Sequence, residues 1–102
     1  MGKKRIEIPR DKLAEFCKRN HIRKLSLFGS VLRRDFGSKS DIDMLAEFEP
    51  GNEPGFIRLS AMERELSSML GGRKIDLVTK QFLNHRIRGR VLSEAEVQYV
   101  QR

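Results

Sequence analysis

The segment Leu25–Phe48, LSLFGSVLRRDFGSKSDIDMLAEF, decides how this chain is expected to fold. An apolar run ends at the pair Gly29 and Ser30, and a second apolar run begins with Asp41 and Asp43 on either side of an isoleucine. Residues i and i+2 of a strand point to the same face, so these two carboxylates are expected about 6.6 Å apart along one face. The segment therefore predicts a strand, a turn into a short helix, and a second strand that opens with paired acids.

Both features of this segment suit the phosphates of a nucleotide. Paired carboxylates can bridge divalent cations, which lie roughly 3.5–4 Å apart in two-metal sites. The turn at Gly29 and Ser30 can hold phosphate, because free N–H groups and the dipole at a helix N-terminus favour an anion. Each feature alone also has a plainer explanation. The two acids could be solvent-facing residues or a helix cap, and the turn could be an ordinary strand–helix connection. An EF-hand is excluded, because its glycine is missing and Asn52 stands where the bidentate glutamate is required.

A third acid lies far along the chain, inside the apolar string KIDLV. Ile75 and Leu77 would point to one face of a strand and Asp76 to the other. An acid in such a strand costs free energy unless it has a partner, which could be a cation or a nearby arginine. If this strand neighbours the strand of Asp41 and Asp43, three carboxylates converge on one face. Such a set suits Mg²⁺, which prefers oxygen ligands.

Length and composition are those of one small globular domain. The chain has 102 residues, of which 38% are hydrophobic and 34% charged. No apolar run is long enough to cross a membrane, and the basic N-terminus lacks the apolar stretch of a secretory signal. Cys17 is the only cysteine, which excludes an intrachain disulfide and suits a reducing cytoplasm.

The net charge of +7 is unevenly distributed. Residues 1–40 carry 12 basic and 4 acidic side chains, residues 41–72 carry 2 and 7, and residues 73–102 carry 7 and 3. Basic flanks can attract polyanions such as nucleotide phosphates, RNA or an acidic protein, although a solvated basic surface explains any single residue equally well. Direct binding of nucleic acid therefore stays open.

Helical and strand patterns alternate along the whole chain. Helices are expected over residues 9–20, 30–34, 56–70 and 81–93, and strands over residues 22–28, 41–48, 73–79 and 95–100. The clearest helix has an apolar stripe and ends at a glycine pair. This order predicts an α/β (α+β) fold: a small mixed β-sheet with helices packed on one side, forming a single domain over residues 1–102.

The chemistry-bearing residues together resemble a known family. The string GSVLRRDFGSKSDIDMLAEF is similar to the signature G-S-x-x-R-x-x-x-x-x-x-S-D-x-D of the polymerase-β-type nucleotidyltransferases. The matching positions are Gly29, Ser30, Arg33, Ser40, Asp41 and Asp43. KIDLVT looks like the strand that carries the third acid, and the short chain resembles the minimal nucleotidyltransferases of HEPN/MNT toxin–antitoxin systems. Many members have glycine where this chain has Arg34, which puts the fine positioning of the loop in question.

The resemblance implies a site and a reaction. Gly29, Ser30, Arg33 and Ser40 are expected to bind the nucleotide, with the arginine facing either a phosphate or a structural acid. Asp41 and Asp43 would hold two Mg²⁺ ions, and Asp76 would complete the metal site and help to deprotonate the attacking hydroxyl. Metal ions would align attack at the α-phosphate of ATP and release of pyrophosphate.

The resemblance also implies a partner. Minimal nucleotidyltransferases often act as antitoxins, pairing with a helical HEPN-type toxin, and some transfer AMP to a tyrosine hydroxyl of that toxin. Homo- or hetero-oligomers are possible, since no second domain is expected to bind the acceptor. Three alternatives remain: neutralisation of the partner by occlusion, adenylyl transfer to a small molecule, and nucleic-acid binding.

Overall fold

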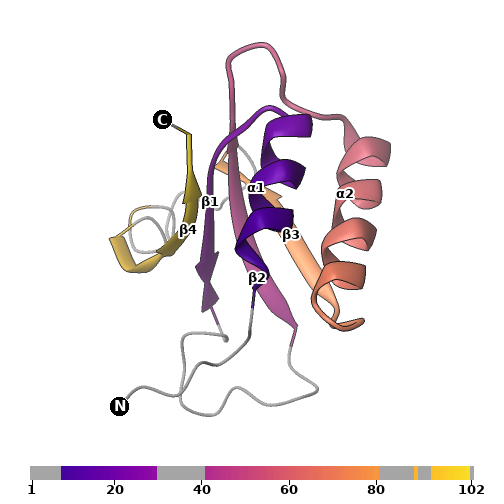
Figure 1. Ribbon diagram of the computed structural model, residues 1–102. Coiled ribbons are helices and arrows are strands. Elements are labelled where there is room, and N and C mark those ends of the chain that lie inside the picture. Colours follow the sequence, from indigo (N-terminus) through magenta and orange to yellow (C-terminus); the bar gives the residue numbers. More distant parts are fainter. Residues whose placement is uncertain (1–7, 30–40, 81–88, 90–92, 102) are drawn as a thin grey trace.

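The computed structural model describes residues 8–29, 41–80, 89 and 93–101 (Figure 1). Two helices and four strands lie in this part of the chain. In chain order they are α1 (Arg10–Arg19), β1 (Ile22–Phe28), β2 (Ile42–Phe48), α2 (Phe56–Met69), β3 (Ile75–Thr79) and β4 (Glu96–Val100).

The four strands form one mixed sheet in the order β3-β2-β1-β4. β1 pairs antiparallel with both β2 and β4, whereas β2 pairs in parallel with β3. Parallel neighbours need a crossover connection, and α2 provides it between β2 and β3. The expected mixed sheet is confirmed, and the strands predicted around Asp43 and Asp76 are neighbours.

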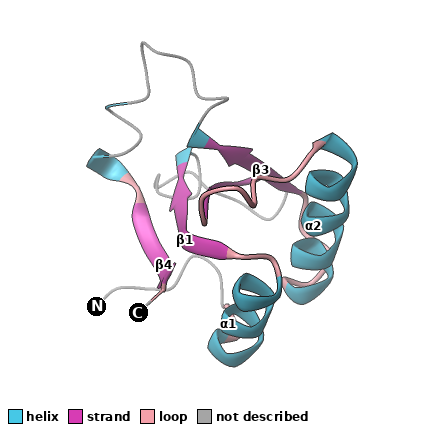
Figure 2. Cartoon of the chain, turned by 90° about the horizontal axis from the view of Figure 1, so that it is seen from above, coloured by secondary structure: helices cyan, strands magenta, loops and turns pink. Residues whose placement is uncertain are grey.

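Both helices pack on the same face of the sheet (Figures 1 and 2). Their apolar side chains meet the inward-facing residues of the strands in one core. The helices contribute Leu13, Phe16, Cys17, Leu59, Met62 and Leu66, and the strands contribute Ile22, Leu25, Leu27, Ile42, Met44, Ala46, Phe48, Ile75 and Leu77. The apolar stripe predicted for α2 is therefore the core-facing side of this helix. Among the residues described, no helix is long and apolar enough to cross a membrane.

The element boundaries differ from the predicted ones by one or two residues. β2 begins at Ile42 rather than Asp41, because the N–H of Ile42 makes the first bond to the neighbouring strand, donating to the carbonyl of Lys74 over 2.9 Å. β3 begins at Ile75 rather than Arg73, and α2 ends at Met69 rather than Leu70. Differences of one or two residues at the ends of helices and strands are common. The predicted helix over 30–34 lies outside the described residues, as does most of the one over 81–93.

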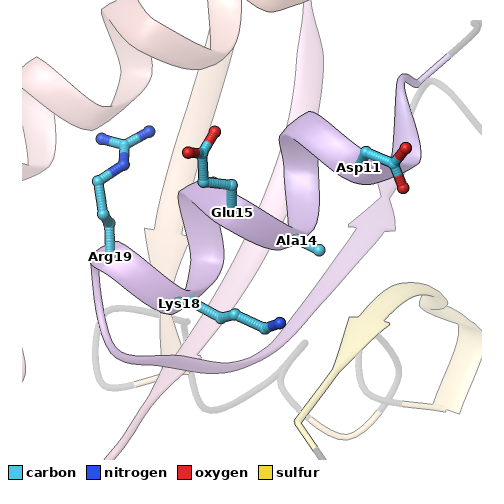
Figure 3. A pocket seen from close by; sticks show the side chains of 5 residues that line it. All are labelled: Asp11, Ala14, Glu15, Lys18 and Arg19. Atoms are coloured by element: carbon cyan, nitrogen blue, oxygen red, sulfur yellow. The ribbon is translucent and has the colours of Figure 1, made fainter.

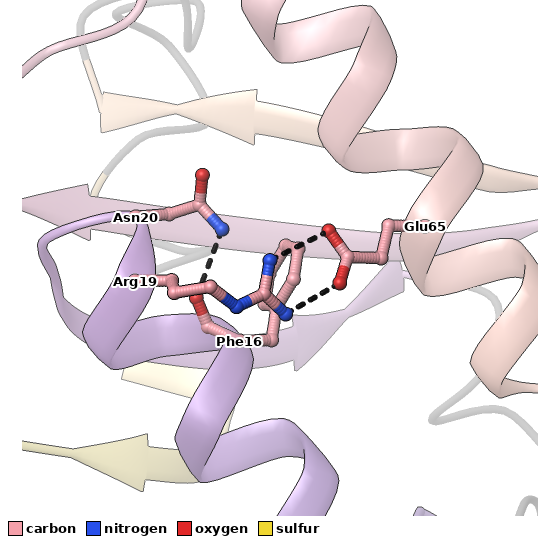
Figure 4. A network of polar contacts seen from close by, with 4 residues as sticks. All are labelled: Phe16, Arg19, Asn20 and Glu65. Atoms are coloured by element: carbon pink, nitrogen blue, oxygen red, sulfur yellow. Dashed lines mark hydrogen bonds and ion pairs between the residues drawn. The ribbon is translucent and has the colours of Figure 1, made fainter.

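A bidentate ion pair links the two helices on the surface (Figure 4). The Arg19 guanidinium donates to Glu65 over 2.6 Å and 3.3 Å, joining the end of α1 to the middle of α2. The hydrogen bond and the charge of Glu65 raise the pKa of Arg19. Both side chains are substantially exposed, so this pair orients the helices while the core beneath supplies most of the stability.

Cys17 is fully buried in α1, as expected for a small apolar side chain. Burial raises the pKa of its thiol from the ordinary 9.0 to about 12. Between these two values the unfolded chain binds fewer protons than the folded one, so the free energy of unfolding falls as pH rises. We expect a contribution of up to about 1.4 kcal/mol per pH unit in this range.

Urea unfolding at pH 8, 9, 10 and 11 would measure this contribution. Cys17→Ala lacks the thiol and is otherwise unchanged, so its stability should fall less steeply above pH 9. Equal slopes for the two proteins would contradict the effect of burial on Cys17.

Candidate active site

Three strand ends meet at one border of the sheet. β1 ends at Phe28, while β2 and β3 begin at Ile42 and Ile75. Phe28 lies opposite Asp43 across the antiparallel pair, and Asp43 lies opposite Asp76 across the parallel pair. Two acids that are 33 positions apart in the sequence are thus direct neighbours in the sheet.

Both acids lie on the face of the sheet opposite α1 and α2. Ile42 and Met44 are buried in the helix-side core, so Asp43 between them points to the opposite face. Ile75 and Leu77 are buried in the same core, and Asp76 between them is exposed. The alternation that the sequence predicted for KIDLV is confirmed.

Asp41 lies just before β2, on the approach to this border. Its carboxylate is 3.9 Å from the ammonium of Lys74, which precedes β3. Within the described residues, no three side chains of His, Cys, Asp or Glu are gathered closely enough to be recognised as a metal-binding group. The strand register itself brings only Asp43 and Asp76 together.

Gly29 brings the backbone that follows β1 against the Asp43 carboxylate. Its φ of +75° lies in the left-handed region that favours glycine. A Cβ at this position would collide with the Asp43 carboxylate oxygen and would lie 3.2 Å from its carboxyl carbon. The glycine predicted for the turn thus also makes room for one of the predicted acids.

The other predicted nucleotide-binding residues, Ser30, Arg33 and Ser40, lie outside the described residues, as does Arg34. The sequence also allowed a structural arginine partner for Asp76, but among residues 8–29, 41–80, 89 and 93–101 Asp76 forms no ion pair with an arginine. The chemistry of the predicted acids fits a hard divalent cation, because it consists of carboxylate oxygens.

One polar residue beside this border was not singled out from the sequence. The carboxylate of Glu63, on α2, accepts a hydrogen bond of 2.8 Å from the backbone N–H of Leu77. Leu77 directly follows Asp76 on β3. No sequence signal indicates this bond, because it depends on β3 lying at the edge of the sheet within reach of α2.

Two surface hollows lie on the helix side of the sheet, away from Asp43 and Asp76. One of about 510 Å³ lies along the exposed side of α1, lined by Asp11, Ala14, Glu15, Lys18 and Arg19 (Figure 3). Another of about 450 Å³ lies between α1 and β4. Neither contains a predicted site residue, so the open border of the sheet remains the candidate active site.

Comparison with protein families gives a match over most of the chain. Residues 10–97 match the nucleotidyltransferase domain family. Protein adenylyltransferase MntA of Thermococcus cleftensis is 35% identical over 80 residues, which make up 78% of each chain. MJ1379 of Methanocaldococcus jannaschii is 34% identical over 64 residues, so the match spans 63% of the length of that relative.

Solved structures share the fold. One described as a minimal nucleotidyltransferase is 31% identical, with a TM-score of 0.69 over 84% of this chain and 85% of the other. A toxin–antitoxin structure with AMP-PNP is 18% identical, with a TM-score of 0.73 over 93% of this chain and 76% of the other. A structure of a tri-AMPylated Shewanella oneidensis HEPN toxin with an MNT antitoxin is 18% identical, with a TM-score of 0.65 over 90% of this chain and 70% of the other. At 18% identity the likeness concerns the fold alone.

Proposed function

We propose that this chain, which belongs to the nucleotidyltransferase family, is a Mg²⁺-dependent adenylyltransferase. In this proposal it transfers AMP from ATP to a tyrosine hydroxyl of a HEPN-type toxin. The observation that carries this proposal is the register of Asp43 against Asp76, on the face of the sheet opposite α1 and α2. The contact of Gly29 with Asp43 adds to it, because the predicted phosphate-binding turn then begins beside the predicted metal ligands.

In the proposed reaction the tyrosine oxygen attacks the α-phosphorus of ATP, and the bond from that phosphorus to the bridging oxygen breaks. AMP joins the tyrosine and pyrophosphate leaves. Asp41 and Asp43 would hold the cations, which when bound neutralise charge on the phosphoryl oxygens. The exposed carboxylate of Asp76 would accept the proton of the hydroxyl and complete the metal site.

The remaining residues would orient the nucleotide. Gly29 and Ser30 would present backbone N–H groups to the triphosphate, because a turn into a helix leaves such donors free. Arg33 and Ser40 would add side-chain donors, and a guanidinium can contact phosphate oxygens in a bidentate way. These residues would fix the α-phosphorus in line with the incoming oxygen.

The proposed partner follows from what the structural neighbours contain. The similar antitoxin fold occurs with a tri-AMPylated HEPN toxin and, in another structure, with AMP-PNP. The nucleotidyltransferase domain would bind ATP, and the partner protein would supply the acceptor hydroxyl. The net charge of +7 would help such a domain to attract ATP and an acidic partner surface.

Transfer of label from α-³²P-ATP to a HEPN-type toxin co-expressed with this chain tests the proposal. With Mg²⁺ we expect label on the toxin, loss of label in Asp41→Ala/Asp43→Ala, and loss of label when the acceptor tyrosine is replaced by phenylalanine. Labelling that persists in the double variant would contradict the assigned metal ligands. No labelling, with the double variant still silencing the toxin, would instead indicate neutralisation by occlusion.

A further inference from the structure

We infer that Glu63 is a positioning residue for Asp76: its hydrogen bond to the backbone of Leu77 holds β3 in the register that places Asp76 beside Asp43. The inference rests on the proposed function, because it concerns how one of the proposed metal ligands is held. It goes beyond that function in assigning a role to a residue on the helix side of the sheet.

β3 lies at the end of the strand order and, among the strands that the structure describes, pairs only with β2. The carbonyl of Lys74 accepts a hydrogen bond from Ile42, at the start of β2. The backbone groups of successive strand residues point alternately to the two sides of the strand. The backbone N–H of Asp76 therefore points toward β2, and that of Leu77 points to the other edge of β3. An edge strand with only one neighbour is a weak platform for a side chain that needs accurate placement.

Glu63 supplies the missing contact at this edge. α2 packs its apolar stripe on the sheet, and Glu63 reaches from the helix to the outward N–H of Leu77 at 2.8 Å. A hydrogen bond to an ionised carboxylate is stronger than one between neutral groups. The Leu77 side chain is 2% exposed, so this residue is anchored through its side chain in the core and through its backbone at the edge.

Asp76 directly precedes Leu77 in the chain and lies opposite Asp43 in the sheet. Asp76 itself is exposed and cannot be fixed by packing. Its position therefore depends on the backbone of β3, and Glu63 fixes that backbone one residue away. Residues that orient metal ligands in this indirect way commonly change metal affinity by about 10–100-fold when they are replaced.

Glu63→Ala removes the acceptor, whereas Glu63→Gln retains an amide oxygen that can accept the same N–H. Glu65→Ala is the matched control, because Glu65 lies on the same helix but binds Arg19 instead. A role confined to stability would lower the unfolding midpoint and leave the Mg²⁺ requirement of the folded protein unchanged.

The experiment is a Mg²⁺ titration of the full chain followed by the amide NMR signals of Asp76 and Leu77, with AMP transfer measured alongside. For Glu63→Ala we expect a midpoint about tenfold higher in Mg²⁺, a similar loss in kcat, and faster hydrogen exchange at Leu77. Glu65→Ala should match the unmodified chain, and Glu63→Gln, whose amide oxygen accepts a weaker neutral bond, should lie between the unmodified chain and Glu63→Ala.

The two proposals fail in different ways in this experiment. A Mg²⁺ response in the unmodified chain that Glu63→Ala leaves unchanged would overturn the role of Glu63 alone. The absence of both a Mg²⁺ response and transfer in the unmodified chain would overturn the proposed function, and the role of Glu63 with it.

Discussion

Asp43→Asn should reduce AMP transfer on the order of 10³-fold, because cation-held charge stabilisation is worth several kcal/mol and each 1.36 kcal/mol is a factor of ten. Asp43 is the central residue of the site: Gly29 contacts its carboxylate, and Asp76 lies opposite it in the sheet. Asparagine has nearly the same shape, so the fold and the contact with the turn should persist. The measurement is single-turnover labelling of the toxin with α-³²P-ATP.

Glu47→Gln is the control for this change. Glu47 lies four residues further along β2, on the same face of the sheet, and its carboxylate is 3.6 Å from the ammonium of Lys80. Glu47→Gln makes the same chemical change on the same strand but away from the site. Transfer should therefore stay within about twofold, since ion pairs near the surface contribute little. Equal losses in the two variants would show that the overall charge of this face matters, rather than the carboxylate of Asp43.

Gly29→Ala should lower transfer by about 100-fold, because a displacement of roughly 1 Å near the reacting groups can cost that much. The new methyl group would occupy the space of the Asp43 carboxylate, which would have to rotate away. The positive φ of Gly29 adds a strain of roughly 1–2 kcal/mol for any residue with a Cβ. Urea unfolding and labelling of the toxin measure the two effects separately.

Gly51→Ala separates strain from collision. Gly51 has a φ of +83°, yet a Cβ there would meet nothing within 4 Å. Its stability should fall by a similar amount, roughly 1–2 kcal/mol, while transfer by the folded protein stays unchanged. If Gly51→Ala lost transfer as strongly as Gly29→Ala, backbone strain rather than the position of Asp43 would be responsible.

Local patterns in the sequence predict most of the described fold. The strand over residues 22–28 has the bounds that its pattern indicates, and the alternation of Ile75, Asp76 and Leu77 gives the correct faces. Such patterns report which side chains are buried, and burial is what the periodicity of a strand or helix encodes. The resemblance to the nucleotidyltransferase signature led to the family that the comparison then identified.

The contacts between distant segments could not be predicted in the same way. The approach of Gly29 to Asp43 depends on the register between β1 and β2, and the bond from Leu77 to Glu63 depends on β3 having an open edge. Asp41 was expected within a strand but lies just before it, because the first interstrand bond forms at Ile42. These details arise from tertiary pairing, about which neighbouring residues carry little information.

The parallel pairing of β2 with β3 also makes the candidate site depend on a contact between distant parts of the chain. Asp43 and Asp76 meet only after the intervening chain, including α2, has formed a crossover and closed a loop of more than thirty residues. Closing such a loop costs chain entropy before the contacts it allows can repay it. A chain in which β2 and β3 have not yet paired would lack the neighbouring acids, and the proposed activity would therefore depend on a completed fold.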